Sequence, residues 1–76
     1  MNKERRKRIQ EIVDNLEEIK GRINEIQEEE RECFDNLSEG LQQTERGQGY
    51  EAAAESLSEA EMNVDDVISA LDAAME

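Results

Sequence analysis

The side chains best suited to chemistry in this 76-residue chain are carboxylates, because it holds 21 Asp and Glu residues but no His and one Cys. The densest run is Glu28–Glu32, which continues to Asp35. Such a run could bind a metal ion or supply acid–base catalysis, but di-iron carboxylate bundles also need Glu-x-x-His pairs, and the lack of His excludes them. A calcium loop over 35–40 is excluded because Leu37 occupies a ligand position. We therefore expect no metal, no cofactor and no catalytic residue, and interpret the run as a solvated helix face.

Two residues near this run have an additional interpretation. Cys33 has no His to act as its base, and the nearby carboxylates disfavour a thiolate, so we expect a small buried apolar residue rather than a nucleophile. Glu30 falls at an inward position of the helical repeat, where an unpaired carboxylate is costly. It either sets the helix register or, together with Cys33, lines a gap that receives a ligand.

A third candidate group, Arg46 and Tyr50, lies just after the middle of the chain and could contact an anionic ligand. Arg46 is the only basic residue after Arg31, and Tyr50 is the only tyrosine. Gly47 and Gly49 separate them and could let backbone N–H groups approach an anion at the start of a helix. The alternative is a flexible connection without a ligand.

These residues are positioned by a long helix that the apolar spacing predicts over residues of about 3–37. Apolar side chains recur every three or four residues from Ile9 to Leu37, as in a helix that packs against other helices. In a seven-residue repeat, positions 9, 16, 23, 30 and 37 form one inward row, called a, and positions 12, 19, 26 and 33 form a second, called d. Seven of these nine residues are Ile or Leu, so this stripe must be covered by another helix.

A second helix is predicted over about 45–75, after a connection over about 38–44. Gly40 is expected to end the first helix in a left-handed conformation, and Thr44 is expected to cap the second. Gly47 and Gly49 weaken the first turn, so the helix is expected to become regular only near Tyr50. Its apolar stripe follows the same seven-residue repeat: Tyr50, Leu57, Val64 and Leu71 at a, and Ala53, Ala60, Val67 and Ala74 at d.

The distribution of charge favours an antiparallel arrangement of these two helices. Residues 1–8 carry a net charge of +4, whereas residues 47–76 contain eight acidic residues and no Lys or Arg. Folding the chain back places Lys3–Arg8 beside the acidic residues of the last turns, namely Asp65, Asp66, Asp72 and Glu76. We interpret the basic segment as neutralising those acids and do not expect it to bind nucleic acid directly, because the whole chain has a net charge of −12.

The predicted fold is therefore all-α, a long antiparallel helical hairpin with residues 1–76 as a single domain. A chain this short buries little surface, and one cysteine cannot form an internal disulfide, so we expect two copies to pair as a four-helix homodimer. No apolar run is long enough to span a membrane, and no signal-peptide core follows the basic start. A cytoplasmic location is expected.

The remaining functional feature is a dense acidic surface on the second helix. Such a surface could imitate the phosphates of nucleic acid and occupy a basic groove on a protein, or it could serve only solubility. The candidate binding residues are six acids of this helix: Glu51, Glu55, Glu59, Glu61, Asp65 and Asp66.

The chain also resembles small acidic helical accessory proteins of bacterial phages and prophages. The resemblance rests on the basic, Ile-rich start, on Asp35-Asn36-Leu37, on Glu39-Gly40-Leu41-Gln42, on Thr44-Glu45-Arg46 and on the Ala-rich acidic helix after them. It implies a non-enzymatic protein that inhibits or sequesters a host protein, such as a nuclease or a defence component. Two alternatives remain: a sponge that binds a small anionic nucleotide between Arg46, Tyr50 and a second chain, and a purely structural oligomerisation module.

Overall fold

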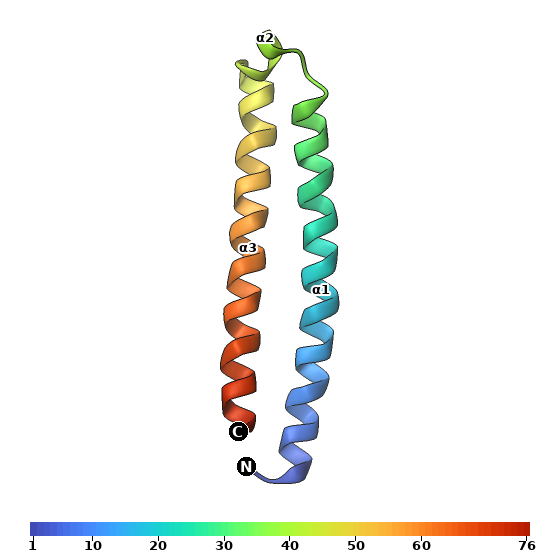
Figure 1. Ribbon diagram of the computed structural model, residues 1–76, viewed down its shortest axis with the longest axis vertical. Coiled ribbons are helices and arrows are strands. Elements are labelled where there is room, and N and C mark those ends of the chain that lie inside the picture. The colour runs from blue at the N-terminus through green and yellow to red at the C-terminus, as the bar shows by residue number, and fades with distance from the viewer.

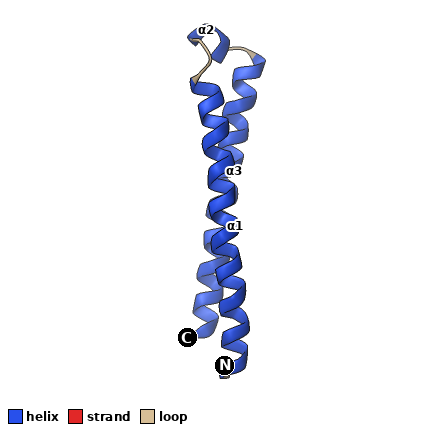
Figure 2. Ribbon diagram, turned by 90° about the vertical axis from the view of Figure 1, so that its right-hand side faces the viewer, coloured by secondary structure: helices blue, strands red, loops and turns tan.

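The computed structural model describes all 76 residues as two long antiparallel helices joined by a short helical corner. Helix α1 spans Lys3–Asp35, α2 spans Glu39–Gln42 and α3 spans Glu45–Met75. The molecule is a rod of 58 × 15 × 12 Å with both termini at one end and α2 at the other (Figure 1). Seen from the side, α1 and α3 lie against each other along nearly their whole length (Figure 2). The predicted all-α hairpin is confirmed.

Each helix begins at a polar residue whose side chain caps the first turn. The side-chain oxygen of Asn2 accepts a hydrogen bond from the backbone N–H of Arg5 at 2.8 Å. Ser38 caps α2 through the N–H of Leu41, and Thr44 caps α3 through the N–H of Gly47 at 3.5 Å. Because the first N–H groups of a helix lack partners within the helix, these oxygens fix where each helix starts. The prediction of Thr44 as an N-cap is confirmed.

The corner is closed by a glutamine side chain rather than by a left-handed glycine. No residue has a positive φ, and Gly40 lies within α2, so the prediction for Gly40 was wrong. Instead, the side-chain amide of Gln42 donates to the carbonyl oxygens of Phe34 at 3.1 Å and Leu37 at 3.2 Å. The Phe34 carbonyl also accepts from the backbone N–H of Leu37 at 3.1 Å, so the Gln42 side chain ties α2 to the turn that follows α1.

Helix α3 is regular from Glu45 onward, so the expectation that it becomes regular only near Tyr50 was also wrong. Gly47 is buried beneath the backbone of Gln42, where a Cβ atom would lie 2.6 Å from the Cα atom and 2.7 Å from the carbonyl carbon. The absence of a side chain at Gly47 therefore lets α2 pack directly on the first turn of α3.

The seam between α1 and α3 uses the a row and the row one residue after d, called e. On α1 the buried and half-buried residues follow a four-three spacing: Ile9, Val13, Leu16, Lys20, Ile23, Gln27, Glu30 and Phe34. Leu37, just after the helix, is also half-buried. On α3 the same spacing is followed by Tyr50, Ala54, Leu57, Glu61, Val64, Ile68, Leu71 and Met75. Three residues that flank this stripe are also half-buried: Ala53, Ser58 and Ala60. The prediction that the d row of α1 faces inward was wrong, because Ile12, Ile19, Ile26 and Cys33 are exposed.

The reason for this seam lies in α3, whose d row is small and whose e row contains Ile68 and Met75. Only three apolar side chains are buried in the whole chain, Val13, Ala54 and Ile68, and none of them falls below 2% exposure. One helix covering one side of another can bury only a narrow stripe. The hairpin therefore has a thin core and leaves a broad apolar strip uncovered.

Candidate protein-binding faces

The hairpin has two broad faces, and the seam determines which residues lie on each. In an α-helix, a step of one residue turns a side chain by about 100°. The residue directly after each a residue therefore points to one face of the antiparallel hairpin. The residue directly before each e residue, which is the d residue, points to the opposite face. The first set defines the polar face: Gln10, Glu17, Asn24 and Arg31 of α1, with Glu51, Ser58, Asp65 and Asp72 of α3. The second set, which is the d row of both helices, defines the apolar face.

An ion pair joins the two helices on the polar face. The Lys20 Nζ atom lies 2.7 Å from Oδ1 of Asp65, and both side chains remain partly exposed. The hydrogen bond that Lys20 donates to Asp65 raises the pKa of Lys20, with smaller contributions from the charges of Asp65, Glu17 and Glu61 and an opposing effect of desolvation. This is the only ion pair in the structure. The basic segment Lys3–Arg8 lies at the same end of the rod as the C-terminus (Figure 1) but forms no ion pair, and Asp65, which was expected beside it, pairs with Lys20 instead.

A second polar link between the helices is centred on Gln27, which is buried in the seam at 7% exposure. With its amide oriented to satisfy both neighbours, Gln27 donates to Oε1 of Glu61 at 3.1 Å and accepts from Nη2 of Arg31 at 3.1 Å. A buried amide needs such partners, because a polar group without one is costly. The Lys20 and Gln27 contacts together fix the register of α1 against α3.

The six acidic residues predicted to bind a partner do not share one environment. Glu61 lies in the seam and contacts Gln27, and Asp65 is occupied by Lys20. The other four are exposed and form no ion pair: Glu51, Glu55, Glu59 and Asp66.

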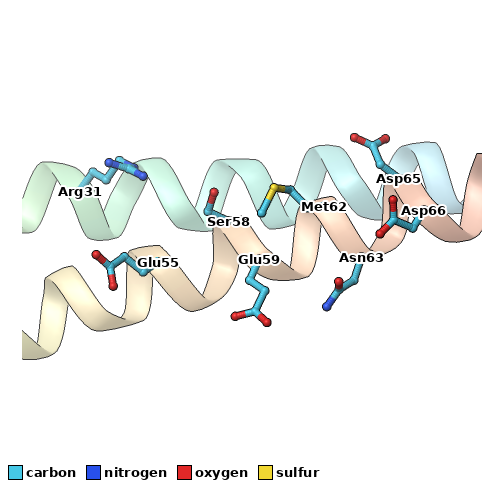
Figure 3. A pocket seen from close by; sticks show the side chains of 8 residues that line it. All are labelled: Arg31, Glu55, Ser58, Glu59, Met62, Asn63, Asp65 and Asp66. Carbon is cyan, nitrogen blue, oxygen red and sulfur yellow. The ribbon is translucent and has the colours of Figure 1, made fainter.

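A shallow hollow runs along α3 among these acids (Figure 3). Its lining combines one guanidinium from α1 with polar and acidic side chains and one methionine of α3: Arg31, Glu55, Ser58, Glu59, Met62, Asn63, Asp65 and Asp66. Carboxylates outnumber cations there by four to one, so this surface favours a positively charged partner.

Arg46 and Tyr50 contact each other at the start of α3. The Arg46 guanidinium carbon lies 5.8 Å from the centre of the Tyr50 ring, and Nε and Nη2 each lie 3.4 Å from the phenolic oxygen. This hydrogen bond raises the pKa of Arg46. None of the four surface hollows includes either residue, and Glu30 is half-buried in the seam without an ion pair. The three residues thus form no common site within one chain.

The apolar face is the feature that sequence reasoning placed wrongly. Ile12, Ile19 and Ile26 are 47%, 42% and 48% exposed, and Val67 of α3 is 49% exposed. We call the three isoleucines the isoleucine row, and Ala53, Ala60, Val67 and Ala74 the small-residue row. The signal was present in α1, which has apolar residues at a, at d and partly at e, more than one partner helix can cover.

Neither long helix contains an apolar stretch that could cross a lipid bilayer, and no three cysteine or acidic side chains converge on a point where a metal ion could sit. No protein family, curated protein or solved structure matches the chain.

Proposed function

We propose that this chain is a non-enzymatic binding protein whose α3 surface attaches to a basic surface of a partner protein. The observation that carries the proposal is the row of four exposed acids without ion pairs: Glu51, Glu55, Glu59 and Asp66. Helix α3 contains only one basic residue, Arg46, and that residue is turned toward Tyr50. The acidic field of α3 is therefore not neutralised by its own helix.

The rigidity of this surface also supports the proposal. All four acids lie on one continuous 31-residue helix, which holds their spacing before a partner arrives. Carboxylates at fixed spacing along a narrow rod can take the place of nucleic-acid phosphates in a basic groove. The partner class we propose is a nucleic-acid-binding host protein, such as a nuclease or defence component in the bacterial cytoplasm, in line with the phage resemblance.

The test is capture of bacterial host proteins on the immobilised chain at low and high ionic strength. The Debye length falls from about 30 Å at 0.01 M salt to about 8 Å at 0.15 M, so a charge-dominated contact weakens steeply over that range. The test variant combines four neutral replacements: Glu51→Gln, Glu55→Gln, Glu59→Gln and Asp66→Asn. We expect it to lose the proteins that the wild-type chain captures, with association slowed by about tenfold or more.

Helix α1 offers a matched control with the same change in net charge. It carries exposed glutamates at seven-residue intervals, which can be replaced together: Glu11→Gln, Glu18→Gln, Glu25→Gln and Glu32→Gln. The control should retain the captured proteins. Equal losses in both variants, or capture that is unchanged by salt, would show that the α3 surface is not the binding site.

A further inference from the structure

The apolar face lacks a cover, although its composition is that of a helix-packing surface. The isoleucine row repeats every seven residues along α1, and the small-residue row repeats every seven residues along α3. Seven-residue repeats of large and small apolar side chains are typical of helices that bury those rows against other helices. One hairpin cannot bury its own rows, because both point away from the seam toward the same face.

We propose that a second copy of this chain covers the apolar face, with α1 of each copy lying antiparallel on α3 of the other. The resulting dimer has its two-fold axis along the rod and is an isologous four-helix bundle. The proposal concerns the apolar face and is independent of the acidic surface proposed to bind a partner protein.

The first argument is complementarity of size at matching levels. The Lys20–Asp65 and Gln27–Glu61 contacts set α1 against α3 so that Ile19 is level with Val67, and Ile26 is level with Ala60. A two-fold axis along the rod keeps every residue at its own level. Each isoleucine of one copy thus meets a small residue of the other, which allows the helices to approach closely.

The second argument is charge. Helix α1 carries eight basic and eleven acidic residues, whereas α3 carries one basic and eight acidic residues. The alternative axis, which crosses the rod, would place α3 on α3 and so bring the two most negative helices together. Like charges across an interface are unfavourable, and pairing α1 with α3 separates the α3 helices.

The third argument is the area available. A face of 58 × 15 Å offers a projected surface of about 870 Å², close to the roughly 800 Å² that each partner contributes to a stable protein–protein interface. The hairpin alone buries only three apolar side chains, which is a small core for 76 residues. A second copy would bury the exposed isoleucine row together with Val67 and Ala74, and would complete the burial of the half-buried Ala53 and Ala60.

Sedimentation equilibrium tests the proposal directly. We expect the wild-type chain to have twice the 8.7 kDa chain mass, and the variant Ile19→Glu/Ile26→Glu to have half of the wild-type value. The control Gln10→Glu/Asn24→Glu adds the same charge to the polar face and should remain dimeric. A monomeric wild-type chain, or a dimeric Ile19→Glu/Ile26→Glu variant, would overturn the proposal.

A disulfide test remains informative if the glutamate variant fails to fold. Cys33 lies on the apolar face, level with Ala53, so the wild-type chain is mixed with the variant Cys33→Ser/Ala53→Cys and oxidised. Each chain then has one thiol, and the expected product is a covalent heterodimer that reductant separates. The control variant Cys33→Ser/Ser58→Cys carries its thiol on the polar face and should give none. Absence of the heterodimer with the Ala53→Cys variant, or equal yields with both variants, would overturn the proposed arrangement.

Discussion

Replacing Gly47 by alanine should destabilise the protein, although alanine is the better helix former. A Gly-to-Ala change inside a helix ordinarily gains about 0.5–1 kcal/mol. At Gly47, however, the new Cβ atom would lie 2.6 Å from the Cα atom of Gln42 and 2.7 Å from its carbonyl carbon. Because these are backbone atoms, α2 must move away, and overpacking of this kind costs about 1–3 kcal/mol. The Gly47→Ala variant should therefore lose about 1–2 kcal/mol in the free energy of unfolding.

The same helix supplies the control for this prediction. Gly49 lies two residues further along, and a Cβ atom there meets nothing within 4 Å. Gly49→Ala should therefore raise the free energy of unfolding by about 0.5–1 kcal/mol. Urea unfolding followed by far-ultraviolet circular dichroism measures both variants at equal chain concentration. If Gly47→Ala proved as stable as Gly49→Ala, the packing of α2 on α3 described above would be refuted.

Three further predictions concern the cap, the seam and the ion pair. Thr44→Ala removes the acceptor for the N–H of Gly47 and should lower the free energy of unfolding in urea by about 1 kcal/mol. Ile68→Ala empties a buried seam position and should cost about 2–4 kcal/mol in the same assay, and an unchanged midpoint would contradict the observed seam. The raised pKa of Lys20 means that its pair with Asp65 stabilises the folded state fully below pH 10.5 and loses this effect as pH rises through the higher folded pKa. The melting temperatures of wild type and Lys20→Gln should therefore differ at neutral pH and converge at strongly alkaline pH. A difference in melting temperature that grew with rising pH would contradict a raised pKa of Lys20.

The hairpin itself could be predicted from the sequence, because apolar spacing identifies helices without knowledge of their partners. Residues 9–37 show the repeat clearly, and Thr44 marks the start of the second helix by a local hydrogen-bonding rule. The choice between two adjacent apolar rows could not be predicted in this way. Ile19 is more apolar than Lys20, yet Lys20 lies in the seam, because the small d row of α3 and the larger Ile68 and Met75 of its e row determine which row of α1 is covered.

The corner and the candidate surface were harder to predict for the same reason. Gly40 has the residue type of a helix terminator, but the structure uses the side chain of Gln42, whose partners lie five and eight residues earlier. Gly47 indicated a weak helix, whereas its role is to make room for Gln42. Likewise, Glu61 and Glu59 are both acids of one helix, and only the seam distinguishes the half-buried one from the exposed one.

Both chain termini lie at one end of a 58 Å rod, here called the handle end, and the α2 corner forms the opposite, free end. A fluorophore or affinity tag on either terminus sits far from α2 and leaves the corner unobstructed. In a dimer whose two-fold axis runs along the rod, all four termini gather at the handle end and both corners point the same way. Attached to a surface through its termini, such a dimer would stand upright and hold both corners at the same height.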